Sequence, residues 1–282
     1  MTIALIDADM VQFYEHMRCE VDVELGDEMW TRFADLNDVR EGFWDTINLI
    51  RKDAGELQVT NVQLCFTGNS EFRKRLDPAY KANRAGKKKP IGFKAFKQEL
   101  LLDHGAFLHN EIEADDALGI LATGLEKERL DYVIVSGDKD LNQIPGHHYW
   151  PFKPEHERHW YVTPNEALFN FYTQVLIGDS VDNIPGCRGI GKVSAEKIVR
   201  KFDFQKPVEC WKEIVSCFEA SNKKLEAKNP KRPLVAGDEF WIPIPAEENA
   251  LLQARLVKIL QHGDYDLKAR KVTLWTPPTL TH

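Results

Sequence analysis

The chain has 282 residues, enough to bury one large core or a main domain with a smaller one. Its hydrophobic content of 43% and charged content of 29% are those of an ordinary globular protein, and no apolar run is long enough to cross a membrane. The net charge of −7 argues against binding nucleic acid by bulk charge, and five scattered cysteines without a C-x-x-C pair argue against a disulfide framework or a zinc knuckle.

The first predicted strand covers residues 3–6 and is followed by Asp7-Ala8-Asp9. The carboxyl ends of strands in a parallel sheet are where such sheets hold ligands. We therefore expect Asp7, rather than Asp9, to serve a site, although a plain turn with two acids fits the same residues. No basic region precedes this apolar run and an acid follows it, which predicts a cytoplasmic protein rather than a secreted one.

A helical pattern over residues 33–49 and a second strand over residues 59–66 predict a crossover and a parallel pair of strands. A basic segment follows, at about residues 70–97. Lysines and arginines neutralise phosphates, and aromatic rings offer stacking faces, so this segment predicts an arch that contacts nucleic acid. A charge run is more often a solvated surface. The segment contains Arg73, Lys74, Arg75, Lys81, Arg84, Lys87, Lys88 and Lys89, interleaved with Phe72, Tyr80 and Phe93.

The central stretch, residues 111–140, carries two groups of acids. A helix is predicted at residues 94–103 and a strand at 106–109, before the first group opens an amphipathic helix; a strand at 132–135 then leads to the second group. Either group alone can also be explained without a metal, as helix caps in the first case and turn residues in the second. Together they predict a cation site, because crowded carboxylates repel by about 4 kcal/mol at about 4 Å in an effective dielectric near 20. The acids are Glu111, Glu113, Asp115 and Asp116, then Asp138 and Asp140.

Oxygen ligands favour Mg²⁺, Mn²⁺ or Ca²⁺, and a metal pair held by carboxylates suits hydrolysis of phosphodiesters. Four histidines at 147, 148, 156 and 159 suggest zinc as an alternative, but their Pro-rich surroundings favour a polar surface loop. An edge strand is predicted at residues 160–162.

A capping box at Thr163 and Glu166 starts a helix that ends at residue 177. Asp179 and Asp182 follow and can add two carboxylates to the site. Gly186, Gly189 and Gly191 then predict a tight loop whose backbone N–H groups form a phosphate seat before a helix at residues 192–202. Further elements are predicted at residues 208–219 (helix), 240–245 (strand), 247–261 (helix) and 271–275 (strand).

The alternation of strands and helices predicts an α/β fold with a central, mainly parallel sheet flanked by helices. We expect a core at residues 1–162, including the basic segment, and a helical region with a C-terminal extension at residues 163–282.

In order along the chain, I-D-A-D, Y-K-A-N-R, E-A-D-D, S-G-D-K-D and G-D-S-V-D-N-I-P-G-C-R-G-I-G resemble the flap endonuclease or 5′ nuclease superfamily, in particular phage-encoded 5′ to 3′ exonucleases. The resemblance covers most of the chain. It implies a PIN-like 5′ nuclease fold with a helical arch and a helix-three-turn-helix. It also implies two Mg²⁺ ions, for which Mn²⁺ would substitute, and a K⁺ ion at the helix-three-turn-helix.

The resemblance assigns roles residue by residue. The catalytic set is Lys81, Arg84, Asp7, Asp115 and Asp138. The metal ligands are Asp7, Glu113, Asp115, Asp116, Asp138 and Asp140, with Asp179 and Asp182 for a second ion. Tyr80 would stack on the terminal nucleotide. The residues implied to contact nucleic acid are Arg73, Lys74, Tyr80, Lys81, Arg84, Lys87, Lys88, Gly189, Gly191, Lys192 and Ser194.

Two features depart from the family pattern. No acid follows the second strand at Thr67-Gly68-Asn69, and Val193 stands where many members have a lysine, with Lys192 beside it. The first departure bears on one outer metal contact and the second on a phosphate contact.

The sequence thus predicts a divalent-metal-dependent 5′ to 3′ exonuclease or flap endonuclease, monomeric, acting on DNA with 5′ ends or flaps and on RNA–DNA hybrids. We expect no contact with a membrane. Replication proteins are expected partners, in the host cytoplasm if a phage encodes the chain. The alternatives are a PIN-type endoribonuclease, which needs neither basic arch nor glycine loop, and a protein that binds branched DNA without cutting it.

Overall fold

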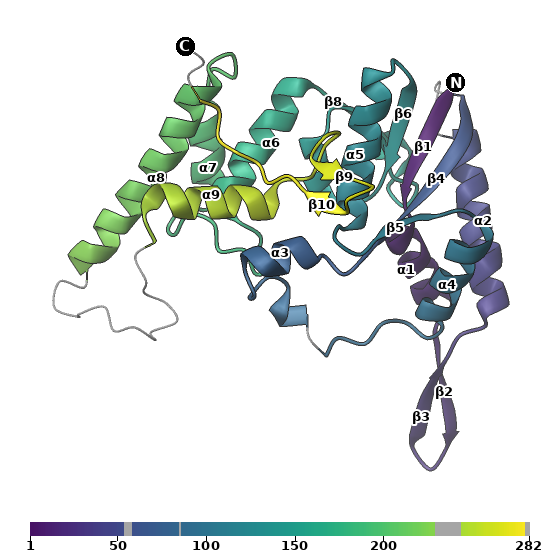
Figure 1. The fold of residues 1–282 in the computed structure, drawn as a ribbon. Helices are drawn as coiled ribbons and strands as arrows, with labels where there is room; N and C mark the ends of the chain where they lie inside the picture. Colours follow the sequence, from purple (N-terminus) through teal and green to yellow (C-terminus); the bar gives the residue numbers. More distant parts are fainter. Residues whose placement is uncertain (54–57, 85, 229–243, 280–282) are drawn as a thin grey trace. The chain divides into compact units, whose positions relative to one another are not determined.

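The computed structural model describes residues 1–53, 58–84, 86–228 and 244–279 (Figure 1). The chain divides into two compact units, each assembled from several segments. The first comprises Met1–Phe72, Gly86–Thr163 and Ile259–Thr273, and the second comprises Arg73–Ala85, Pro164–Lys258 and Leu274–His282. This division differs from the predicted one in two segments, because residues 73–85 group with the second unit and residues 259–273 with the first.

The first unit is built on a sheet whose described strands have the spatial order β5-β4-β1-β6-β7-β8. Neighbouring strands are parallel except for β7 and β8. Ile6 of β1 is level with Leu64 of β4 and Val135 of β6, so these strands end together. The predicted mainly parallel sheet and edge strand are confirmed. The bounds are β1 Thr2–Asp7, β4 Val59–Thr67, β5 Phe107–His109, β6 Asp131–Val135, β7 Gly146–Tyr149 and β8 His159–Val162.

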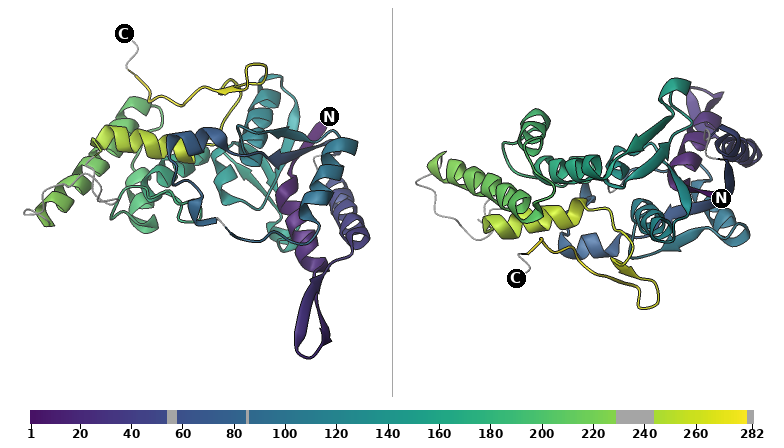
Figure 2. Two further views of the ribbon diagram at one scale, coloured as in Figure 1. Left: turned by 60° about the horizontal axis from the view of Figure 1, so that its bottom comes forward. Right: turned by 90° about the horizontal axis from the view of Figure 1, so that it is seen from above.

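Helices cover both faces of this sheet (Figure 2). Strand side chains alternate between faces, and Ile6 and Val135 belong to the hydrophobic core that includes Phe43 of α2 and Phe96 of α4. Leu5 is fully buried toward the opposite face, where α5 contacts β1, β4 and β6. The bounds are α1 Ala8–Cys19, α2 Leu36–Asp53, α4 Phe93–Asp103 and α5 Ala114–Lys127.

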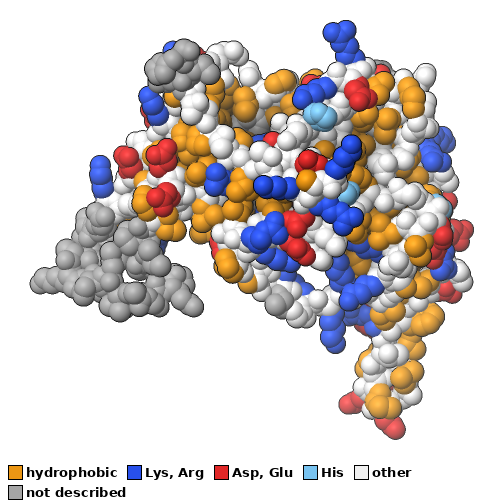
Figure 3. All heavy atoms as spheres, viewed as in Figure 1, with side chains coloured by type: hydrophobic (Ala, Val, Ile, Leu, Met, Phe, Trp, Pro, Cys, Tyr) orange, Lys and Arg blue, Asp and Glu red, His pale blue; other side chains and the backbone are white. Residues whose placement is uncertain are grey.

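A hairpin between α1 and α2, formed by β2 (Val21–Gly26) and β3 (Met29–Phe33), was not predicted. The helix predicted from residue 33 begins at residue 36 instead, because Phe33 ends the hairpin. The alternation Val-Asp-Val-Glu-Leu over residues 21–25 is a strand pattern, and Gly26 with φ 101° allows the turn. Hydrophobic side chains lie exposed along the hairpin, with acids at its tip (Figure 3).

Helices form the core of the second unit. Trp211, Ile214 and Phe218 of α8 pack with Val175 of α6 and Leu256 of α9. The predicted helices are present, although α8 runs further and α7 ends earlier than expected; the strand predicted at 240–245 falls mostly outside the described residues. The bounds are α6 Pro164–Ile177, α7 Lys192–Val199, α8 Pro207–Lys228 and α9 Ala246–Val257.

Short elements complete the described chain. They are α3 Glu71–Leu76, the 3₁₀ turns η1 Ala82–Arg84, η2 Lys139–Gln143 and η3 Glu155–Glu157, and the paired strands β9 Tyr265–Asp266 and β10 Lys271–Val272. Among the helices of the described residues, none combines the length and the apolar character that crossing a bilayer requires.

The histidine-rich segment is not the surface loop that was predicted. His147 and His148 lie in β7, which pairs with β8 beginning at His159. The ring of His148 is buried, its Nε2 lies 2.9 Å from the carbonyl oxygen of Ile144, and burial lowers its pKa to about 4. His147 Nδ1 faces His159 Nε2 at 3.0 Å. The described residues contain no group of three or more side chains arranged for zinc.

Candidate active site

Asp7 is the acid at the end of the central strand β1. Its carboxylate caps α1 by accepting the backbone N–H of Met10 at 3.1 Å, and it accepts a hydrogen bond from the hydroxyl of Ser136 at 3.2 Å. The residue is only 6% exposed. Burial first, and the negative charges of Asp9 and Asp138 after it, raise the pKa of Asp7 to about 7. An anion here is therefore unfavourable unless a cation joins it.

The neighbouring strand β6 delivers the next acids. Asp138 caps the short turn η2 by accepting the backbone N–H of Asp140 at 2.9 Å, and its own N–H is bound by Ser136 at 3.1 Å. Because Ile6 pairs with Val135, Asp7 and Asp138 follow adjacent strand ends. The Ser136 hydroxyl contacts both the Asp7 carboxylate and the N–H of Asp138, so these two residues lie near each other.

The start of α5 carries the other acidic group. Glu113 and Asp116 form a reciprocal capping box, in which the Asp116 carboxylate accepts the backbone N–H of Glu113 at 3.1 Å. The second oxygen of Asp116 accepts the N–H of Leu260 at 3.1 Å, and the residue is fully buried. Asp116 therefore has a structural task as a helix cap, whereas Asp115 is half-buried at the same helix end.

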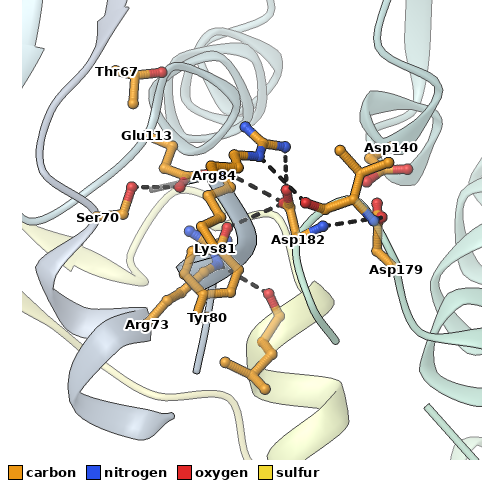
Figure 4. Close-up of polar contacts among 12 residues, drawn as sticks. Thr67, Ser70, Arg73, Tyr80, Lys81, Arg84, Glu113, Asp140, Asp179 and Asp182 are labelled. Atoms are coloured by element: carbon orange, nitrogen blue, oxygen red, sulfur yellow. Dashed lines mark hydrogen bonds and ion pairs between the residues drawn. The ribbon is translucent and has the colours of Figure 1, made fainter. Parts of the chain in front are cut away.

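The end of β4 anchors this helix start. The backbone N–H of Ala114 donates to the Thr67 hydroxyl at 3.2 Å, and the Ser70 hydroxyl donates to Glu113 (Figure 4). Gly68 donates its N–H to Ile112 at 3.0 Å. Ser70 was not among the predicted site residues. No local pattern indicates it, since a serine after a strand is an ordinary turn residue.

Most of the expected ligands of the first unit thus lie at the carboxyl ends of neighbouring parallel strands or at the start of α5. Among the described residues, however, no three His, Cys, Asp or Glu side chains already enclose an ion position. A metal site shared by the six predicted ligands of this unit stays a prediction. The observed feature is a crowded group around Asp7, with oxygen donors only, which fits a hard divalent cation rather than zinc.

Asp179 and Asp182, the acids expected to serve a second ion, belong to the second unit. Asp179 accepts the backbone N–H groups of Val181 and Asp182, at 2.7 and 3.3 Å, and so caps the turn after α6. The Asp182 carboxylate is held by the guanidinium of Arg84, by the ammonium of Lys81 at 3.5 Å and by the Tyr80 hydroxyl at 3.3 Å (Figure 4). Their place beside the first group of acids stays a prediction.

The basic pair of the motif Y-K-A-N-R is therefore already neutralised within its own unit. Lys81 has φ 56° and donates its backbone N–H to the carbonyl of Asp182 at 2.8 Å. Arg84 ends η1 and also donates to the carbonyl of Val181 at 3.3 Å. The segment predicted to be an arch is thus attached to the turn that follows α6, at least over residues 81–84.

Two residues predicted to contact nucleic acid are buried in this structure. Arg73 is only 2% exposed, and it donates to the backbone carbonyls of Leu256 and Lys258 at 2.9 and 2.8 Å, so it closes the end of α9. Tyr80 is 3% exposed and packs in the core of the second unit, so its ring is not available for stacking at the surface of this structure. Both residues look exposed in the sequence because they lie in a basic run.

The other predicted contacts lie at the surface. Val193 is 82% exposed, and the adjacent Lys192 reaches Glu196 at 4.0 Å. Adding a Cβ at Gly189 or Gly191 would meet no atom within 4 Å, so both backbones are open to solvent at the start of α7. The exposed predicted contacts are Lys74, Arg84, Lys87, Lys88, Gly189, Gly191, Lys192 and Ser194.

A half-buried lysine was also not predicted to belong to the site. Lys97 of α4 places its ammonium 3.1 Å from Asp9 and 2.8 Å from the carbonyl oxygen of Thr67. The sequence shows it only as the last of a run of lysines.

Acids gathered at the carboxyl edge of a parallel sheet, with oxygen donors only, fit a hydrolase of phosphodiesters, and the comparisons with known proteins identify the family. The model of the family described as "5'-3' exonuclease, N-terminal resolvase-like domain" matches residues 3–167. The chain belongs to this family and is a nuclease. It is also 27% identical, over 98% of its length and 93% of the relative, to the exodeoxyribonuclease of Enterobacteria phage T3.

Two solved structures share the fold. The T5 5′-exonuclease with bound zinc ions has a TM-score of 0.58 and 17% identity, and the match covers 91% of this chain and 89% of that one. The bacteriophage T5 flap endonuclease, in a pseudo-enzyme-product complex with DNA and metal ions, has a TM-score of 0.55 and 16% identity, with the same coverage. The family match favours the nuclease over the endoribonuclease and binding-protein alternatives.

Proposed function

We propose that this chain is a divalent-metal-dependent 5′ to 3′ exonuclease that also cleaves 5′ flaps, with DNA as its substrate. The family match, the T3 relative and the T5 structures with metal ions and DNA support the proposal. The observation that carries it is the buried Asp7, whose pKa is raised to about 7 by burial and by the charges of Asp9 and Asp138. At neutral pH such a carboxyl group is ionised only in part, and a nearby cation favours its anion.

The proposed cofactor is Mg²⁺, as two ions, with Mn²⁺ as a substitute. When bound, such a pair supplies Lewis acidity that lowers the pKa of a water molecule and offsets charge on the phosphate. Asp7, Asp115 and Asp138 are the proposed ligands at the reacting phosphate. Glu113, Asp116 and Asp140 support the same group, and Asp179 and Asp182 serve the second ion.

Lys81 and Arg84 are proposed to bind the scissile phosphate. Both now pair with Asp182, so substrate binding requires them to exchange a carboxylate for a phosphate. That exchange keeps each cation paired, which makes it less costly than exposing a buried charge. Water then attacks the phosphorus atom and the bond to the 3′ oxygen breaks, which leaves a 3′-hydroxyl and a 5′-phosphate.

The exposed glycine turn before α7 is proposed to bind duplex phosphates through its backbone N–H groups, with K⁺ at the same turn. An RNA strand in a hybrid, a monomeric enzyme and replication proteins as partners belong to the same proposal.

The test is cleavage of 5′-labelled and 3′-labelled blunt duplex, 5′-flap, nicked and RNA–DNA substrates, with Mg²⁺ and with EDTA. Asp138→Asn is expected to reduce cleavage at least a hundredfold. Asp131→Asn is the matched control, because Asp131 starts the same strand β6 and is exposed. Undiminished Mg²⁺-dependent cleavage by Asp138→Asn would contradict the assignment, and metal-independent binding without any product would contradict the proposed activity.

A further inference from the structure

The strand β4 ends at Thr67, and Thr67-Gly68-Asn69 contains no acid. A carboxylate cannot be placed at the middle position of this backbone. A Cβ added at Gly68 would lie 2.0 Å from the backbone oxygen of His109 and 2.7 Å from the Cα of Asn110. The close approach of the two chain segments therefore requires glycine.

The ammonium of Lys97 lies at this strand end. It is 2.8 Å from the carbonyl oxygen of Thr67, and 3.1 and 3.4 Å from the two carboxylate oxygens of Asp9. It also lies 4.8 Å from the centre of the Phe66 ring, on the face where a cation is attracted. The side chains of Lys97 and Asp9 are only 17% and 18% exposed.

Asp9 bonds to the same strand end as Lys97. Its second carboxylate oxygen accepts the backbone N–H of Thr67 at 2.6 Å, so Asp9 bonds to Thr67 directly and also through Lys97. The Lys97–Asp9 ion pair is half-buried, so removing either charge would leave the other one desolvated and unpaired.

This ion pair lies close enough to the acidic centre to act on it. Asp9 lies in the first turn of α1, two positions after its cap Asp7, so its negative charge adds to the crowding there. Thr67, to which Lys97 and Asp9 both bond, also accepts the N–H of Ala114 at the start of α5. A positive charge 3.1 Å from Asp9 opposes that crowding, and it is fixed by three hydrogen bonds and a ring rather than free to leave. Lys97 therefore places a positive charge at the edge of the predicted metal site.

We propose that Lys97 is a positioning residue that serves as a built-in cation of the acidic centre: its ammonium holds Asp9 and the end of β4 and replaces part of the charge that a divalent ion would otherwise supply. The proposal deepens the proposed function and rests on it. It follows that the ammonium competes electrostatically with divalent cations, so this centre binds them more weakly than the same acids would without Lys97.

The test is calorimetric titration of the metal-stripped, full-length protein with MnCl₂ in the absence of DNA. Lys97→Gln keeps donors for Thr67 and Asp9 but removes the charge. We expect it to bind Mn²⁺ about tenfold more tightly than the unaltered chain, which corresponds to about 1.4 kcal/mol. Lys97→Arg keeps the charge and is expected to stay within about twofold. Lys94→Gln is the matched control, because Lys94 lies on the same helix and is exposed.

A second readout does not involve metal at all. In EDTA at low salt, Lys97→Gln is expected to lower the melting temperature, and added NaCl is expected to recover part of the loss by screening the acids. Lys94→Gln should show neither effect. If Lys97→Gln fails to fold, a Lys97→Arg variant with altered Mn²⁺ affinity contradicts the proposal, and unchanged affinity supports it.

The possible outcomes distinguish the role of Lys97 from the existence of the metal centre. Mn²⁺ affinity that is equal in the unaltered chain and in folded Lys97→Gln would overturn the role of Lys97 and leave the metal centre standing. An equal change in Lys94→Gln would overturn it too, because the effect would then be one of net charge. An unaltered chain that binds no Mn²⁺ at all would overturn both the metal centre and the role of Lys97.

Discussion

Replacing Asp7 by asparagine tests the crowding at the acidic centre without measuring catalysis. Asparagine keeps an acceptor for the N–H of Met10 and is itself a good helix cap, so α1 should be unaffected. What changes is the charge. Moving the pKa of a carboxyl group from its ordinary 3.8 to about 7 corresponds to about 4 kcal/mol of unfavourable free energy for the anion in the folded state.

The pH dependence follows from the same shift. Below pH 3.8 the Asp7 carboxyl group is protonated in both the folded and the unfolded chain. Between pH 3.8 and about 7 only the folded chain keeps the proton, so the free energy of unfolding falls as the pH rises through this window. At pH 8 both states are ionised and the whole penalty applies.

The assay is urea unfolding in EDTA at pH 5 and pH 8. At pH 8 Asp7→Asn is expected to raise the free energy of unfolding by about 2 to 4 kcal/mol, with the smaller value applying if Asp138 relaxes away. At pH 5 the gain should be smaller. Asp45→Asn, on the exposed face of α2, is the matched control and should change little.

Adding Mg²⁺ at pH 8 should then stabilise the unaltered chain more than Asp7→Asn, because a cation relieves the repulsion that the substitution has already removed. Asp7 is not a destabilised anion if Asp7→Asn is no more stable than the unaltered chain at pH 8 in EDTA.

Three further predictions concern other parts of the chain. Arg73→Met should lower the free energy of unfolding by about 2 to 4 kcal/mol, measured by urea unfolding, and leave the salt dependence of DNA binding unchanged. Lys74→Met should leave the free energy of unfolding unchanged and reduce the salt dependence of DNA binding. Gly68→Ala should lower the melting temperature by several degrees in a thermal scan, because its Cβ would meet the backbone of His109; no loss would contradict the packing. Asp182→Asn should tighten DNA binding in EDTA about threefold or more, measured by fluorescence anisotropy, since it frees two cations for phosphate; weaker binding would contradict this.

Local patterns were sufficient to predict the sheet and the position of the first acids. The apolar runs that end at Asp7 and before Asp138 are continuous, as expected for strands buried on both faces, and α5 has a regular apolar face with acids at its start. Those signals are contained in a few neighbouring residues, and the structure confirms the elements that they predicted.

Long-range contacts could not be predicted from the same patterns. Arg73 is buried because carbonyl groups some 180 positions later need donors, and nothing near Arg73 in the sequence indicates this. Tyr80 likewise packs against residues of distant helices. Lys97 resembles the exposed lysines before it, and only the fold brings Asp9 and Thr67 to it.

The exchange of segments between the two units has a consequence for dividing this protein. Cutting the chain after Thr163 would remove residues 259–273, whose Leu260 N–H binds the fully buried Asp116 and whose Ile259 N–H binds Gln143 at 3.3 Å. An N-terminal fragment would thus expose the inner end of α5 and the turn after β6 to water. Expression of residues 1–163 alone should give an unstable product, and a fragment study intended to isolate the nuclease core must supply the later segment as well.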